Sequence, residues 1–270
     1  MNRQIPIFSL LTFLTVIGFS CCDDPPAAET GTFSLQFTPN FDSETWAPTD
    51  TYVNQDGRNV AFSDFKFYLS NITLIKEDGE EIELRSEDFD SEVFLVDLFQ
   101  GTIDGDEDSH TFEVPVGNYT GLKLNVGVPE IYNGSDPATY DLDHPLGVRS
   151  GMHWSWNAGY MFVRIDGRVD SSATKSQPPT LSLIYHAGAN GLFRSKAFQA
   201  GNDGFEIKSD EVLTYEFDVD VNKCFYNTTE AIDMAERNLT HTGGEGSTSY
   251  ELAEEVMDNF VNEALTRAPF

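Results

Sequence analysis

Cysteine, tryptophan and basic residues are scarce in this chain. Three cysteines cannot form a disulfide framework, and 16 Lys and Arg against 45 Asp and Glu leave a formal net charge of −29. This charge argues against nucleic acid as a partner, because a polyanion repels an acidic protein. No apolar run of about 18 residues follows residue 20, so the sequence predicts no membrane-spanning helix beyond it. The 13% aromatic content argues against a disordered acidic chain, because so much aromatic surface can form a core.

The first 20 residues are typical of an export signal. Arg3 precedes an apolar run over residues 5–19, and acidic residues follow closely. Such a run is too short for a stable membrane span and predicts a signal peptide over 1–20.

The residues after this signal resemble those of a bacterial lipoprotein. Ser20 is a small residue directly before Cys21, so we expect Cys21 to carry the lipid, with Cys22 as the alternative. The acidic pair 23–24 resembles the export tag of surface lipoproteins in Bacteroidetes-type bacteria. We therefore expect an outer-membrane lipoprotein that faces the periplasm or the cell surface, anchored without spanning the membrane. A plain secretory signal is the alternative.

Lipidation of Cys21 would leave two cysteines in the mature chain. We expect Cys224 to be a buried, small apolar residue. A Cys22–Cys224 disulfide is the alternative in an oxidising compartment.

Alternating apolar and polar residues predict a single, mainly β domain over 32–266, preceded by a tether over 21–31. About ten short strands with turn signals between them favour an antiparallel β-sandwich or barrel-like fold. The predicted strands are 33–37, 59–75, 82–84, 93–98, 111–114, 121–128, 160–165, 180–185, 205–207 and 212–221.

The sequence period changes near the C-terminus. Residues 248–251 fit a capping box, and apolar residues then recur every three to four positions. This pattern predicts an amphipathic helix of about fifteen residues that packs on the domain. A shorter helix is predicted over 227–239, which gives one or two C-terminal helices.

One ten-residue segment, 151–160, carries most of the distinctive chemistry. On a strand, Met152, Trp154 and Trp156 would share one face and His153 would take the other. Thioether ligands select Cu(I), and imidazole suits copper generally. The alternative is an aromatic plug in the core, capped by a loop.

Other histidines add candidate metal ligands. His186 ends an apolar strand, and His144 lies in a loop beside acidic residues, where a carboxylate could orient its ring. His241 is a lower-ranked fourth candidate. A single histidine of this kind more often has a structural role.

Four stretches together resemble the MbnP-like family of copper-binding proteins: 65–72, 115–119, 151–160 and 186–188. In order and spacing the resemblance covers about residues 31 to 265. It implies a secreted or surface β-rich domain that binds copper. In relatives, a tryptophan is oxidised to kynurenine by a dihaem partner of the cytochrome c peroxidase type, and some related surface proteins ligate Cu(I) with histidines and that kynurenine.

The resemblance also suggests site residues. Trp154 or Trp156 is the candidate for oxidation, and His186 is the best candidate ligand for copper, as Cu(I). His153 and His144 come next, with Met152 and Tyr160 in supporting positions. Those relatives place the modified tryptophan two residues before a ligand histidine, whereas here His153 directly precedes Trp154, so the ligand set does not transfer as a unit.

We therefore predict a lipid-anchored, extracytoplasmic copper-binding protein that acquires or handles copper and is not an enzyme. The alternative is a surface carbohydrate- or protein-binding module in which Trp154, Trp156 and Tyr160 form a stacking platform. The copper hypothesis requires histidines of 144–153 to converge on His186, whereas the module requires exposed tryptophan faces.

Overall fold

The structure is a computed structural model that describes residues 29–48, 50–86, 88–99, 108–155, 159–201 and 204–268. The predicted signal, most of the tether with Cys21 and Cys22, and Trp156 lie outside these described residues.

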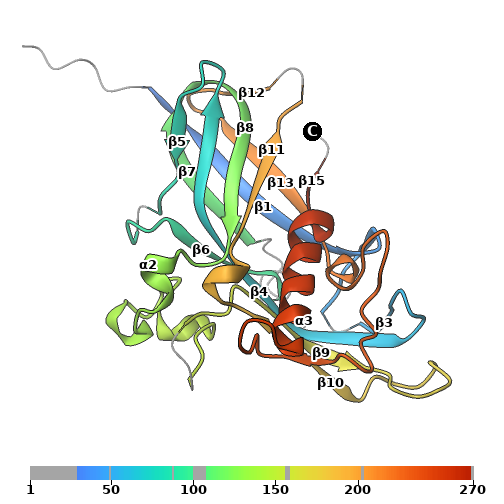
Figure 1. The fold of residues 1–270 in the computed structure, drawn as a ribbon. Helices are drawn as coiled ribbons and strands as arrows, with labels where there is room; N and C mark the ends of the chain where they lie inside the picture. The colour runs from blue at the N-terminus through green and yellow to red at the C-terminus, as the bar shows by residue number, and fades with distance from the viewer. Residues whose placement is uncertain are drawn as a thin grey trace, which may run out of the picture.

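Two β-sheets make up most of the molecule (Figure 1), which confirms the mainly β prediction. In the smaller sheet, the strand order is β15-β13-β1-β2, and β7 also pairs with β1. Its five strands are β1 (Thr30–Phe41), β2 (Glu44–Thr45), β7 (Asp108–Pro115), β13 (Val212–Asp220) and β15 (Leu265–Arg267).

The larger sheet is built around one long strand, β4 (Asn59–Lys76), which pairs with β3, β5, β6, β8 and β9. The order along the sheet is β11-β8-β4-β9-β10-β14, and the sheet curls into a half-barrel (Figure 1). Its other strands are β3 (Tyr52–Val53), β5 (Glu81–Glu83), β6 (Val93–Asp97), β8 (Gly117–Val126), β9 (Val163–Val169), β10 (Leu181–Ala187), β11 (Arg194–Gln199), β12 (Phe205–Ile207) and β14 (Leu239–Thr240).

The sequence predicts antiparallel pairing throughout, but two strand pairs in the structure are parallel. β1 runs parallel to β13, and β10 runs parallel to β14. Parallel pairing requires a long connection between the strands. About 170 residues separate β1 from β13, and more than 50 separate β10 from β14, so both pairings are available to the chain.

The alternating residues of the predicted strands point into one core. Phe33, Leu35 and Phe37 of β1 are fully buried, as predicted from their spacing. The Phe37 ring stacks on Phe217 at 5.2 Å between centroids and meets Phe67 of the larger sheet edge-on at 5.8 Å. Each buried Phe stabilises the fold by about 1.5–3 kcal/mol, so aromatic packing rather than disulfides joins the two sheets. Cys224 is a free, fully buried thiol, as predicted.

Short helices connect the strands, and one longer helix, α3 (Thr248–Asn259), stands alongside the larger sheet in Figure 1. The Ser247 hydroxyl caps its first turn by accepting the Tyr250 N–H, one residue before the predicted capping position. A π-helix continues it over Phe260–Ala264. The structure also describes α2 (Glu130–Asn133) and 3₁₀ turns at Pro137–Thr139, Val148–Ser150, Asn190–Leu192 and Asn222–Phe225.

The predicted helix over 227–239 is wrong. The Asn227 side chain accepts the backbone N–H groups of Thr229 and Glu230, and Ile232 donates its N–H to Phe225 O. These contacts fold the segment into turns, because an Asn side chain competes with the helical hydrogen bonds of its own backbone. The segment ends in β14, which adds to the sheet beside β10.

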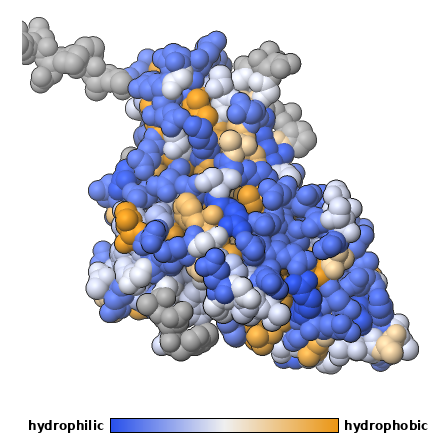
Figure 2. Space-filling model, viewed as in Figure 1, coloured by the Kyte–Doolittle hydropathy of each residue, from blue (hydrophilic) through white to orange (hydrophobic). Residues whose placement is uncertain are grey.

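One side of the molecule, seen in Figure 2, is mostly hydrophilic, and its apolar residues occur in small separate groups. Within the described ranges, we find no helix with the length and apolar character needed to cross a membrane.

Candidate metal centre

The candidate centre lies on the polar face of β9 and β10. His186 of β10 stands opposite Arg164 of β9, and Asp166 is two residues further along β9. Residues two apart on a strand share a face, so Asp166 and Arg164 both flank the His186 ring.

Asp166 fixes the orientation of His186. The His186 Nε2 donates to Asp166 Oδ1 at 2.9 Å. A carboxylate can only accept, so the neutral His186 ring carries its proton on Nε2 and leaves the Nδ1 lone pair free to bind a metal. Burial opposes ionisation of Asp166, but the hydrogen bond from His186 and the hydrogen bond and charge of Arg164 outweigh burial and lower the pKa of Asp166.

His241 supplies a second imidazole from the chain that follows β14. Its Nδ1 lies 3.2 Å from the Nδ1 of His186, and the ring centroids are 5.0 Å apart. Thr242, the next residue, donates its hydroxyl to His186 O and accepts the Gly188 N–H. These two bonds tie the loop that carries His241 to the end of β10.

The surroundings of His241 favour its neutral ring. Burial lowers the pKa of His241, and the neighbouring His186 lowers it further, against the attraction of Asp166. A neutral imidazole is the form that binds a metal ion.

The spacing of the two Nδ1 atoms fits one metal ion. Metal–imidazole bonds are about 2 Å long, so two nitrogens bound to one ion are separated by at most about 4 Å. The observed 3.2 Å corresponds to an angle of about 105° at the ion. Without a metal, the same distance fits a hydrogen bond in which His241 Nδ1–H donates to His186.

Residues 151–155 and 159–161 form the two arms of an irregular hairpin beside this pair. Trp154 N–H donates to Gly159 O, and Met161 N–H donates to Met152 O. Met152 and Trp154 are both buried, which agrees with the shared face predicted for them. Trp156, the other candidate for oxidation, lies outside the described residues.

Trp154 reaches the end of β10. A side-chain Cβ added to Gly188 would lie 2.9 Å from Trp154 Cη2 and 2.1 Å from Tyr160 O. The indole therefore packs against a residue two positions beyond His186, where only glycine fits. The Trp154 Nε1 is buried and has no hydrogen-bond partner, an uncommon state for a buried indole.

Tyr160 and His153 face each other across the hairpin. Their rings meet edge-on at 4.9 Å, and the Tyr160 hydroxyl donates to Leu146 O. Tyr160 is fully buried and Trp154 is only 4% exposed. Two of the three residues of the alternative stacking platform are therefore closed to a ligand in solvent.

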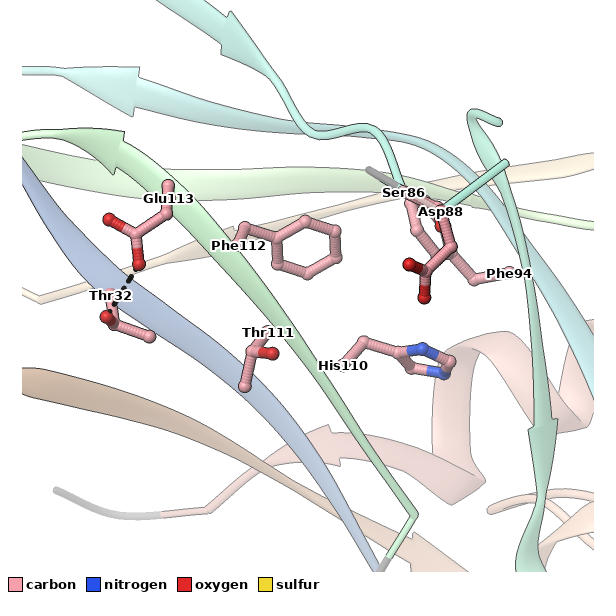
Figure 3. Close-up of a pocket in the computed structure, with 8 residues that line it drawn as sticks. All are labelled: Thr32, Ser86, Asp88, Phe94, His110, Thr111, Phe112 and Glu113. Atoms are coloured by element: carbon pink, nitrogen blue, oxygen red, sulfur yellow. Dashed lines mark hydrogen bonds between the residues drawn. The ribbon is translucent and has the colours of Figure 1, made fainter. Parts of the chain in front are cut away.

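His144 has a separate environment. Its ring stacks on Tyr140 at 4.4 Å, and its Nδ1 accepts the Leu146 N–H at 3.0 Å. Burial lowers the pKa of His144. The His144 ring lines a cavity of about 370 Å³. A second cavity of the same volume adjoins it, and Figure 3 shows that Asp88 and His110 point toward one another in this second cavity.

The predicted convergence of His186, His153 and His144 is not found. In the part of the chain that the structure describes, no group of three or more His, Cys, Asp or Glu side chains is arranged to hold a metal ion. His153 packs on Tyr160 and His144 on Tyr140, whereas His241, ranked fourth from the sequence, is the histidine beside His186. Sequence reasoning also did not single out Asp166, because nothing local distinguishes it among 45 acidic residues.

The MbnP family model matches residues 30–243, a range that contains both histidines of the pair and the tryptophan hairpin. This chain belongs to the MbnP family.

The structure of MbnP from Methylosinus trichosporium shares the fold, with a TM-score of 0.54 and 17% sequence identity. The similarity covers 75% of this chain and 80% of that MbnP chain. A search of curated proteins found no match. In this MbnP-family chain, α3 lies beyond the matched range.

Proposed function

We propose that this MbnP-family chain is a copper-binding protein that holds one copper ion, as Cu(I), between His186 and His241. It would acquire or hand on copper and would not itself turn over a substrate. The observation that carries the proposal is the 3.2 Å separation of two Nδ1 atoms, one of them aimed by a carboxylate. This is the arrangement in which a metal-binding histidine donates its other ring N–H to a carboxylate.

Family membership supplies the choice of metal. Two imidazoles alone suit zinc, copper, iron and nickel, so the donor atoms do not select copper by themselves. The resemblance to copper-binding relatives favours copper among these metals. The net charge of −29 would raise the local concentration of any cation at the surface.

Trp154 is the proposed site of oxidation to kynurenine by a dihaem partner of the cytochrome c peroxidase type. Its indole packs on Gly188 at the end of the strand that carries His186. Its unpaired Nε1 means that the buried indole lacks one stabilising contact in the unmodified state. Trp156 is the alternative residue for this oxidation.

We further propose that the protein is anchored to the outer membrane through lipid on Cys21. The sequence around Cys21 supports this location, and a lipid would hold the domain at the membrane without spanning it. Radiolabelled palmitate incorporated by the wild-type chain and lost in Cys21→Ser would support lipidation, whereas label retained by the variant would favour Cys22.

The test of copper binding is a competition titration with Cu(I) in a Cys22→Ser background, because an accessible thiolate would itself bind Cu(I). We expect one ion per chain and at least tenfold weaker binding in His186→Ala and in His241→Ala, or about 1.4 kcal/mol each. His144→Ala is the matched control and should bind like the parent. Equal loss in His144→Ala, or no loss in His241→Ala, would refute the proposed ligand pair.

A wild-type chain that binds no Cu(I) has two explanations that mass spectrometry separates. If the protein isolated from its host carries an oxidised tryptophan and binds copper, modification precedes binding. If the host protein is unmodified and also binds none, the copper function is wrong.

A further inference from the structure

One guanidinium touches both halves of the candidate centre. Arg164 Nε donates to Asp166 Oδ2 at 2.7 Å, and Asp166 Oδ1 holds His186. The Nη1 of the same side chain donates to Gly151 O at 3.0 Å. A third carboxylate, that of Asp64, lies 3.3 Å from Arg164 Nε.

Gly151 is the point at which the chain enters the tryptophan hairpin. It follows the 3₁₀ turn Val148–Ser150 and has a φ of +67°, in the left-handed region that favours glycine. The next residue, Met152, is already paired with Met161 across the hairpin. The carbonyl of Gly151 is therefore fixed at the base of the segment that carries Trp154.

We infer that Arg164 is a positioning residue, which locks the tryptophan hairpin to the histidine pair through Gly151 on one side and Asp166 on the other. The consequence for copper rests on the proposed function, whereas the mechanical link does not. Because one side chain makes both contacts, the position of Trp154 and the orientation of the His186 ring are set together.

The shape of arginine explains why this residue suits the position. Its planar guanidinium presents donors in a fixed fork, so two acceptors in different directions are held at a defined angle. A lysine would keep the charge but offer a single rotatable ammonium, which cannot hold a carboxylate and a distant carbonyl in the same geometry.

A simpler role would be neutralisation of the two nearby carboxylates. Asp64 and Asp166 both lie beside Arg164, and burial raises the pKa of Asp64 against the attraction of Lys66 and Arg164. Neutralisation depends on charge alone, so Arg164→Lys would preserve it. Positioning depends on the fork, so the same substitution would abolish it.

The experiment compares wild type with Arg164→Lys and Arg164→Gln, and uses Arg168→Lys as the matched control. Arg168 lies four residues along the same strand, is exposed, and donates to Thr180 O. Two readouts use the metal-free protein: NMR of the His186 ring nitrogens, which reports the tautomer, and hydrogen exchange of the Trp154 and Met161 amides. The third is Cu(I) competition.

We expect Arg164→Lys to mix the two His186 tautomers, to speed exchange of both hairpin amides at least tenfold, and to weaken Cu(I) binding at least fivefold. Arg164→Gln should do the same, and Arg168→Lys should change none of the three. Wild-type tautomer and exchange in Arg164→Lys would overturn the inference and leave neutralisation as the role of Arg164.

Two further measurements keep the test decisive. If both Arg164 variants fail to fold, Asp64→Asn is tested instead, because it leaves the Arg164 guanidinium and its contacts intact. Gly151→Pro would not serve, because it alters the turn itself. Under the positioning role Asp64→Asn retains the His186 tautomer and slow hairpin exchange, and loss of either contradicts that role. A wild-type protein that binds no copper would refute the proposed function, while the metal-free readouts would still decide the role of Arg164.

Discussion

The carboxylate of Asp166 lies 2.9 Å from Nε2 of His186, and this contact decides which ring nitrogen is available to a metal ion. The other nitrogen, Nδ1, is the one that faces His241. A residue that touches no metal thus selects the ligand atom.

Replacing Asp166 should weaken metal binding without removing a ligand. In Asp166→Asn the side-chain amide can donate to Nε2, which favours the tautomer with its proton on Nδ1, where the metal would bind. We expect Cu(I) affinity to fall by about 10- to 100-fold. Asp97→Asn is the control, because Asp97 is on the same sheet and pairs with Lys66 at 2.9 Å. Unchanged affinity in Asp166→Asn would show that the tautomer does not matter.

Gly188→Ala should disturb both stability and the tryptophan. The new Cβ would fall 2.1 Å from Tyr160 O and 2.9 Å from Trp154 Cη2, so the hairpin must move. We expect a loss of about 1–3 kcal/mol in the free energy of unfolding, measured with urea. Gly134→Ala, which meets no atom within 4 Å, should have little effect. Equal effects of the two substitutions would argue against close packing at Gly188.

Lys196 is expected to stabilise the end of the C-terminal helix. Its Nζ donates to Val261 O and to Leu265 O, the latter at 2.6 Å, and burial lowers its pKa. Lys196→Met would remove this charged donor from both carbonyls, at a cost of about 1.5–3 kcal/mol in denaturant unfolding.

Lys123→Met is the control for this prediction. Lys123 is on the adjacent strand β8, and its ion pair with Glu81 is about half exposed. Such pairs contribute about 0–1 kcal/mol, so a loss as large as that of Lys196→Met would contradict the special role of Lys196.

Buried tyrosines predict a loss of stability in alkali. Burial raises the pKa of Tyr215 to about 12, against the attraction of Arg267, and also raises the pKa of Tyr68 and Tyr185. An unfolded tyrosine ionises near pH 10, so above pH 10 the unfolded state releases protons that the folded state retains. The stabilisation is present below pH 10 and for Tyr215 is lost between pH 10 and 12, by up to about 1.4 kcal/mol per pH unit.

Urea unfolding from pH 8 to pH 11 tests this. The free energy of unfolding should fall more steeply beyond about pH 10 than below it, and Tyr215→Phe should make the decline beyond pH 10 shallower. A constant free energy of unfolding across this range would show that these hydroxyl groups ionise as readily in the folded protein as in the unfolded chain.

Strands with strong alternation were predictable from the sequence, and those that depend on partners were not. Phe33, Leu35 and Phe37 repeat every second residue and form β1. β11 escaped prediction because its buried positions hold little apolar signal: Lys196 sits within it and Phe198 is its one large buried residue. Its extended form comes from pairing with β8, which local propensity does not reveal.

The candidate site divides in the same way. His186 was identified from its place at a strand end, a local property that the structure retains. His241 and Asp166 lie beside His186 only because β14 pairs with one side of β10 and β9 with the other. The spacing of residues in the sequence does not predict these strand neighbours. Pairing between distant segments, not residue type, assembles the pair.

The parallel pairing of β1 with β13 has a consequence for biogenesis. The first strand of the domain, Thr30–Phe41, is hydrogen-bonded in register to Val212–Asp220, so the smaller sheet cannot be completed until most of the chain is present. Closing so long a loop costs conformational entropy before any stabilising contact forms, so folding through such distant contacts is slow. A chain of this topology would complete its smaller sheet only once Val212–Asp220, in the C-terminal third, is available to pair with the first strand.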